Sequence, residues 1–315
     1  LALPGFAQRQ SERLDRGVVA VNKGNNQMFV SWRFLATDPE NIAFNVYRQV
    51  GSGTPTKINE APITGATNVT MAVSNFYSPI RLSVRPVLNG VEGSEEGYWT
   101  VPAYQRAGFT VRDYTFEPFP EGFPAMAMKF CWVGDLNGDG RYDFVIDRRP
   151  ATSVDETEED VAENAGNIFL DAYNDDGTFK WRIDAGKNVQ TSSGHGDMVT
   201  IFDMDGDGKG EVLMAVSEGT TFPNGQVITK ADGTVTDYNN LPGSAPQWVA
   251  ILNGETGNLI DTISLAHFDE IATTRSDKWK HVTGHFIIAY LDGIRPSLVY
   301  QYKNRQTSGA FTGAY

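Results

Sequence analysis

The sequence predicts an all-β protein in which a small β-sandwich precedes part of a β-propeller. Three observations support this prediction: short stretches that alternate apolar and polar residues, strand–turn–strand units that recur after residue 125, and 32 glycines against a charged fraction of only 21%. Alternation with a period of two is typical of strands buried on one face, and frequent glycine indicates turns. We therefore expect many short strands and no long helices.

Residues 14–103 contain the predicted sandwich. Trp32 lies in an alternating stretch, and the strand Phe44–Arg48 follows it; together they are similar to the middle strands of a fibronectin-III-like domain. About six strands are expected, because many short strands at this spacing favour a sandwich. They are residues 17–21, 28–34, 42–47, 69–73, 80–88 and 98–101. Residues 104–124 carry three prolines among aromatics, which predicts an irregular connector.

Residues 125–315 are predicted to form the incomplete propeller. Three hairpins, beginning near Met126, Met198 and Phe286, share one plan of strand, loop and strand. Two further hairpins, which turn at residues 175–177 and 254–257, lie between them. Four strands per repeating unit are typical of propeller blades. The segment supplies roughly three long units, whereas a closed ring needs about four or more, so we expect a longer protein.

Composition and charge exclude several classes of partner. Lys plus Arg number 26 and Asp plus Glu number 39, so the formal net charge is −13 and nucleic acid or anionic lipid is repelled. No apolar run is long enough to span a membrane, and the single Cys131 excludes an internal disulfide. Residues 1–13 are interpreted as a signal-peptide remnant and leader, because Gly5 and Ala7 fit a cleavage site. We expect a bacterial protein that is secreted, periplasmic or on the cell surface, and a monomer.

Two Asp-rich loops predict binding of Ca²⁺. Oxygen-bearing side chains occupy positions 1, 3, 5 and 9 of each loop, and calcium prefers six to eight oxygen ligands. They are Asp135, Asn137, Asp139 and Asp143 in the first loop and Asp203, Asp205, Asp207 and Glu211 in the second. A true EF-hand has Glu at position 12 and flanking helices, whereas these loops have Ile146 or Met214 and β-rich flanks. The alternative is a pair of plain Asp-Gly turns. Four carboxylates in the second loop predict tighter binding there.

Histidines and a basic segment are the other candidates for a functional site. His195 lies among glycines ahead of the second Asp-rich loop, and His285 has a comparable place ahead of Asp292. Each is a candidate base, metal ligand or substrate donor, or alternatively a loop histidine that only forms hydrogen bonds. Positive residues near Trp279 suit an anionic sugar, with the indole stacking on a ring; the alternative is a solvated loop anchored by one Trp. The candidate binding residues are Arg275, Trp279, Lys303 and Arg305.

An ordered set of motifs resembles family 11 rhamnogalacturonan lyases. The set covers nearly the whole chain: residues 13–21, 29–33, 43–48, 133–140, 170–173, 181–184, 203–209 and 289–299. The resemblance implies a fibronectin-like domain followed by a calcium-loaded eight-bladed propeller. It also implies cleavage of the rhamnose–galacturonate backbone of pectin by β-elimination, with an acidic plant cell-wall polysaccharide as partner. His195, Lys280 and His285 are the residues expected near the scissile bond.

The sequence departs from the family in the segments expected to touch substrate. Gly196–Met198 replaces a tyrosine-containing stretch, and residues 276–285 differ from the family pattern. The family's cleft also draws on blades that are absent here, so an inactive fragment is one expectation for this chain. A non-catalytic, calcium-stabilised propeller that binds glycans or mediates adhesion is the main alternative. A glycoside hydrolase is the third, and it would need two facing carboxylates.

Overall fold

The computed structural model describes residues 12–108, 114–151, 167–189, 199–236, 245–265, 282–304 and 310–314. In these ranges the chain is all-β and contains no α-helix, which confirms the predicted class. The described residues therefore hold no helix of the length and apolar character that a membrane span requires. Contacts divide the chain into an N-terminal unit, residues 14–114, and a C-terminal unit, residues 1–13 and 115–315.

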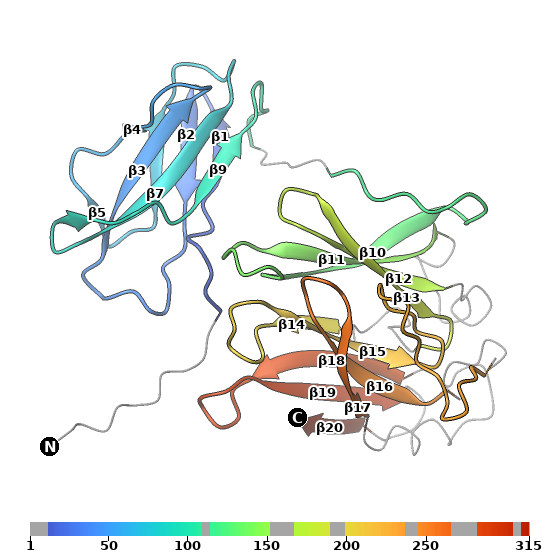
Figure 1. The fold of residues 1–315 in the computed structure, drawn as a ribbon. Coiled ribbons are helices and arrows are strands. Elements are labelled where there is room, and N and C mark those ends of the chain that lie inside the picture. The colour runs from blue at the N-terminus through green and yellow to red at the C-terminus, as the bar shows by residue number, and fades with distance from the viewer. Residues whose placement is uncertain are drawn as a thin grey trace, which may run out of the picture. The chain divides into compact units, whose positions relative to one another are not determined.

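Two antiparallel sheets share one core in the N-terminal unit (Figure 1). The first has the order β1-β2-β6; the second has β4-β3-β7-β8, with β5 also on β3 and β9 on β7. The strands are β1 Val19–Gly24, β2 Gln27–Ser31, β3 Ala43–Val50, β4 Thr56–Lys57, β5 Ile63–Thr64, β6 Asn68–Ala72, β7 Ile80–Leu88, β8 Val91–Glu92 and β9 Tyr98–Val101. Trp32 is buried and meets Phe44 edge-on, with ring centroids 5.4 Å apart. The three unpredicted strands, β4, β5 and β8, have two residues each, too few for a periodic pattern.

Three antiparallel sheets follow one another in the C-terminal unit (Figure 1). Their orders are β10-β11-β12-β13, β14-β15-β16-β17 and β18-β19-β20, so every strand pairs with its neighbour in sequence. The strands are β10 Met126–Gly134, β11 Asp143–Pro150, β12 Ile168–Tyr173, β13 Phe179–Gly186, β14 Val199–Phe202, β15 Glu211–Ser217, β16 Gln247–Leu252, β17 Leu259–Ser264, β18 Val282–Ala289, β19 Ser297–Asn304 and β20 Ala310–Ala314. The first strands are neighbours, since β10 contacts β14 and β14 contacts β18.

Close packing of first strands explains one glycine. A Cβ added to Gly134 at the end of β10 would lie 2.2 Å from Cγ2 of Ile201 on β14, so only glycine fits between these strands.

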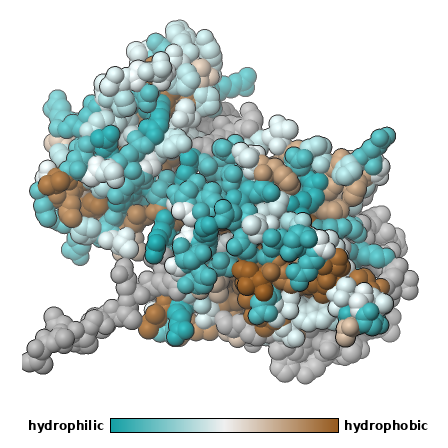
Figure 2. Space-filling model, viewed as in Figure 1, coloured by the Kyte–Doolittle hydropathy of each residue, from teal (hydrophilic) through white to brown (hydrophobic). Residues whose placement is uncertain are grey.

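Val133 on β10 and Ile287 on β18 are exposed apolar residues of the first strands. On the face drawn in Figure 2, apolar surface gathers over the C-terminal sheets within a mostly hydrophilic surface.

The connections between strands differ in length at the two ends of the C-terminal sheets. Short hairpin turns, residues 135–142, 174–178, 203–210 and 253–258, all connect strands at one end, where backbone and side-chain contacts join them. The longer connections leave from the other ends of the same strands. Because the strands are antiparallel, the predicted metal loops and the strand ends that flank residues 190–198 and 266–281 belong to opposite ends.

The segment after the N-terminal unit packs on the first C-terminal sheet without forming a regular element. Arg182 on β13 donates from Nη2 to the carbonyl of Glu117 at 3.1 Å, and its guanidinium lies 3.7 Å from the ring centroid of Phe119. Asp171 on β12 accepts from Nε of Arg182 at 2.6 Å and pairs with the buried Arg148 at 3.3 Å. We call these five residues the clasp: Glu117, Phe119, Arg148, Asp171 and Arg182. The clasp satisfies charges that would otherwise be costly to bury.

Candidate metal centre

The second Asp-rich loop, residues 203–211, folds around the carboxylate of its first residue. Asp203 is buried and accepts hydrogen bonds from the backbone N–H groups of Gly206 at 2.7 Å and Gly208 at 3.0 Å. Both glycines have a positive φ, +84° and +96°, a conformation that other residues adopt at a cost. The loop sequence therefore favours a tight turn around the carboxylate of Asp203.

Three carboxylates converge in this loop. One oxygen from each of Asp203, Asp205 and Glu211 lies within 4.8 Å of the others. Glu211 is the first residue of β15, is buried, and accepts a hydrogen bond from the N–H of Met204 at 2.8 Å. Burial, together with the smaller effect of the neighbouring carboxylates, raises the pKa of Glu211 to about 7. Burial likewise raises the pKa of Asp203.

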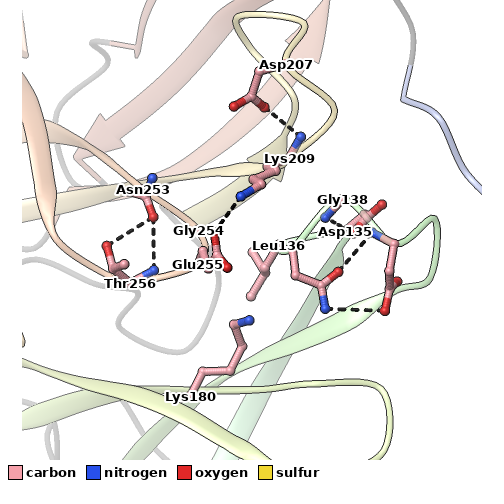
Figure 3. A network of polar contacts seen from close by, with 12 residues as sticks. Asp135, Leu136, Gly138, Lys180, Asp207, Lys209, Asn253, Gly254, Glu255 and Thr256 are labelled. Atoms are coloured by element: carbon pink, nitrogen blue, oxygen red, sulfur yellow. Dashed lines mark hydrogen bonds and ion pairs between the residues drawn. The ribbon is translucent and has the colours of Figure 1, made fainter.

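These three residues fit a hard cation. Gathered carboxylates repel each other, and Asp203 and Glu211 are also buried away from water while Asp205 is exposed, so a bound cation would stabilise the set. Calcium takes oxygen ligands, which is the chemistry that this set offers. The fourth predicted ligand, Asp207, is exposed and instead accepts a hydrogen bond from the N–H of Lys209 at 2.7 Å (Figure 3).

The first Asp-rich loop, residues 135–143, uses its acids differently. Asp135 accepts from the N–H groups of Gly138 at 2.8 Å and Gly140 at 2.7 Å, as its counterpart in the second loop does. Asp143 is fully buried, and its two oxygens accept from the N–H groups of Leu136 at 3.2 Å and Asp175 at 2.9 Å. Burial raises the pKa of Asp143 to about 6.

The remaining two predicted ligands of the first loop, Asn137 and Asp139, form a hydrogen bond with each other. Nδ2 of Asn137 donates to Oδ2 of Asp139 at 3.3 Å. In the described ranges, these acids do not form a converging set of three carboxylates. Glutamate at position 9 is one methylene longer than Asp143, so it reaches the centre of its loop more easily. The geometry therefore favours the second loop as the stronger site, which stays a prediction.

Backbone contacts join the two loops and a third turn. The N–H of Gly210 donates to the carbonyl of Asp135 at 2.6 Å, which links the second loop directly to the first. The indole N–H of Trp181 donates to the carbonyl of Gly254 at 2.8 Å, and a Cβ on Gly254 would lie 1.9 Å from the carbonyl oxygen of Gly210. Lys209 pairs with Glu255 at 2.6 Å across the same junction (Figure 3). These partners are far apart in sequence, so no local sequence pattern predicts their contacts.

Most predicted catalytic and substrate-binding residues lie outside the described residues. These are His195, Arg275, Trp279, Lys280 and Arg305. His285 lies within β18, exposed and opposite Gln301 of β19. Lys303 lies in β19, opposite Thr283 of β18 and Ala310 of β20.

Sequence reasoning missed a buried polar cluster beside the strand ends that flank residues 190–198. Nδ2 of Asn188 donates to the carbonyl of Glu218 at 2.9 Å, and Nε2 of Gln247 donates to the carbonyl of Asn188 at 2.9 Å. The buried carboxylate of Glu218 accepts from the N–H of Thr236 at 2.9 Å. The cluster holds the end of the first sheet against the second. Single polar residues spread over 60 positions carry no local signal.

Comparison with known proteins identifies the family. Residues 124–312 match the family model described as "Rhamnogalacturonan lyase family 11, C-terminal domain", and residues 9–101 match "Rhamnogalacturonan I lyases beta-sheet domain". The chain belongs to rhamnogalacturonan lyase family 11. The resemblance drawn from the sequence motifs is thus confirmed.

Curated relatives of this family 11 chain extend well beyond it. It is 35% identical over 306 residues to the rhamnogalacturonan endolyase YesW of Bacillus subtilis (strain 168), covering 93% of the chain and 46% of the relative. It is 32% identical over 311 residues to the rhamnogalacturonan exolyase YesX of the same organism, with the same coverage. The crystal structure of rhamnogalacturonan lyase YesW aligns with a TM-score of 0.72 at 30% identity, over 98% of this chain and 53% of that one. The chain therefore spans about half the length of these relatives.

Proposed function

We propose that this chain is part of a polysaccharide lyase that cleaves the rhamnose–galacturonate backbone of pectin, rhamnogalacturonan I, by β-elimination. One observation carries the proposal: similarity to a rhamnogalacturonan endolyase and an exolyase extends over 93% of the chain. The similarity includes both units, because the two family models match residues 9–101 and 124–312. Since one relative is an endolyase and the other an exolyase, similarity alone favours neither mode of cutting.

The chemistry sets requirements for the residues. A base removes the C5 proton of galacturonate, its electron pair forms the C4–C5 double bond, and the bond from C4 to the rhamnose oxygen breaks. The leaving oxygen takes up a proton. The galacturonate carboxylate must be neutralised by a cation for C5 to become acidic enough. His195, Lys280 and His285 are our candidates for the base, and Arg275, Lys303 and Arg305 are candidates for holding the carboxylate, with Trp279 stacking on a ring.

Calcium has a supporting place in this proposal. Asp203, Asp205 and Glu211 would hold one ion, and Asp135, Asn137 and Asp139 are the candidates for a second. Bound calcium supplies positive charge that offsets buried carboxylates. Because the Asp-rich loops lie at the opposite end from the strand ends that flank residues 190–198, we assign these ions a structural role.

We further propose that the three C-terminal sheets are blades of a β-propeller and that the N-terminal unit is fibronectin-III-like. Two four-stranded sheets and one three-stranded sheet, all antiparallel and in sequence order with neighbouring first strands, support the propeller. Two sheets around the buried Trp32 support the sandwich. Export of the protein from a bacterial cell is also part of the proposal, supported by the small residues Gly5 and Ala7.

The test is a continuous absorbance assay on rhamnogalacturonan I. Elimination creates an unsaturated product that absorbs ultraviolet light, whereas hydrolysis or binding alone does not. We would compare this chain with the full-length protein, each with calcium and with chelator. Growth of absorbance with the full-length protein is expected, and its loss in His195→Ala with an unchanged melting temperature would assign that residue. No product from either protein would refute the lyase proposal and favour a non-catalytic glycan-binding propeller.

A further inference from the structure

Two exposed tyrosines form a pair at one end of the N-terminal unit. Tyr77 is 71% exposed and Tyr104 is 74% exposed, and their ring centroids lie 6.0 Å apart at an interplanar angle of 41°. Two adjacent exposed tyrosines offer apolar ring faces beside polar hydroxyls, a combination that suits contact with an amphipathic ligand. The pair is therefore a candidate for contact with another molecule.

The backbone holds Tyr104 in place at a conformational cost. Its φ is +60°, a left-handed value that is uncommon for a bulky residue. The N–H of Tyr104 donates to the carbonyl of Phe76 at 2.7 Å, which fastens it next to Tyr77. Strained residues that the surrounding structure over-determines gather at ligand-binding sites.

Hydrogen bonds tie three segments together around the pair. The N–H of Val73 donates to the carbonyl of Asn26 at 2.8 Å, and the N–H of Gly108 donates to the carbonyl of Asn22 at 2.6 Å. Nδ2 of Asn22 donates to the carbonyl of Gln105 at 2.7 Å. Hydrogen bonds therefore connect residues 22–26, 73–79 and 102–108, which we call the rim.

The rim is basic in an acidic protein. It carries the exposed cations Lys23 and Arg106 and contains no Asp or Glu, although the chain as a whole has a net charge of −13. The same three segments also carry exposed amides, including Asn25 and Asn75. Such a surface attracts anionic ligands and offers polar groups to sugar hydroxyls.

We propose that this rim is an accessory binding site for an acidic polysaccharide. Tyr77 and Tyr104 stack on the C–H faces of neutral sugar rings, such as rhamnose, while Lys23 and Arg106 meet the carboxylates of neighbouring uronates. The alternating neutral and acidic sugars of rhamnogalacturonan match this arrangement. The choice of ligand rests on the proposed function, but the site lies outside the candidate catalytic residues.

Binding would be measured by native gel electrophoresis of the 315-residue chain in gels containing rhamnogalacturonan I, with amylose as a neutral comparison. Tyr77→Ala with Tyr104→Gly removes both rings, and glycine accepts the positive φ of residue 104. We expect the double variant to bind rhamnogalacturonan about tenfold more weakly at an unchanged melting temperature. The matched control is Phe34→Ala, a 56% exposed aromatic beyond the other end of β2, which should bind like the wild type.

Charge is tested separately. Lys23→Gln with Arg106→Gln should weaken binding and reduce its salt dependence, whereas Lys57→Gln on β4 should change neither. Unchanged affinity of the tyrosine variant, or an equal loss in Phe34→Ala, would overturn the site. Unchanged salt dependence of the charge variant would overturn the acidic ligand. Lyase activity of the full-length protein is measured independently, so absence of product with normal retardation in the gel would refute only the proposed function.

Discussion

The junction between the two Asp-rich loops makes Gly254 a sensitive position of the C-terminal unit. Its φ lies outside the left-handed region, so alanine is penalised there only by contact. The new Cβ would lie 1.9 Å from the carbonyl oxygen of Gly210 and 2.9 Å from Cδ2 of Leu136, whereas ordinary contact begins at 3.4 Å. The turn must move until both atoms lie at least 3.4 Å from the new Cβ. We expect this movement to break the hydrogen bond from the indole N–H of Trp181 to the carbonyl of Gly254.

The expected cost of Gly254→Ala combines two effects. Overpacking costs about 1–3 kcal/mol, and losing a buried hydrogen bond adds about 1 kcal/mol. We expect a total loss of about 2–4 kcal/mol, which corresponds to a fall in melting temperature of roughly 5–15 °C for a unit of this size. Circular dichroism melts of the whole chain measure it.

The neighbouring residue supplies the control for this prediction. Glu255→Ala removes only the exposed ion pair with Lys209, so it should cost less than about 1 kcal/mol. A melting temperature of Gly254→Ala that matches the value for Glu255→Ala would refute the packing argument. It would show that the turn can move away from Gly210 freely.

Three further predictions concern charge. Calcium at 100 times its dissociation constant should add about 2.7 kcal/mol to the free energy of unfolding. Glu211→Gln should abolish the part of the melting temperature that a chelator removes, whereas Asp232→Asn, at an exposed position, should keep it. Hydrogen bonds, of which the one from Asn45 has the largest effect, lower the pKa of Glu92. The ionised carboxylate therefore stabilises the fold at neutral pH, and this contribution is lost as pH falls below about 4.5. The urea midpoint of Glu92→Gln should depend less on pH in that range than the wild-type midpoint does. Asp171→Asn leaves the buried Arg148 without its full counter-charge, so it should cost about 3–5 kcal/mol and increase cleavage by protease in the clasp; resistance equal to the wild type would contradict this.

Local patterns in the sequence predict much of the fold. The alternation around Trp32 and Phe44 and the hairpin turns after residue 125 place strands where the structure has them. The spacing of Asp203, Asp205 and Glu211 likewise predicts a set of converging oxygens, because a tight glycine turn leaves alternate side chains little choice of direction.

Other features depend on contacts between distant residues. The clasp joins Phe119 to Arg182, and Asn188 meets Gln247. The patterns that predict the individual strands do not tell which distant residues will meet. The bulge in β10 between Met128 and Cys131 allows the N–H of Phe130 to bond Oδ1 of Asp147 at 2.6 Å, which no local rule predicts. That Asp143 turns to the N–H of Asp175 depends on where β12 and β13 place their turn.

The hydrogen bond from Gly210 to Asp135 has a consequence for how the loops respond to cations. Under the proposed calcium occupancy, ordering one loop fixes the backbone of the other, so the second ion meets a site whose ordering entropy is already partly lost. Binding of this kind is positively cooperative and reciprocal. The two loops would then take up calcium over a narrower range of concentration than two independent sites would.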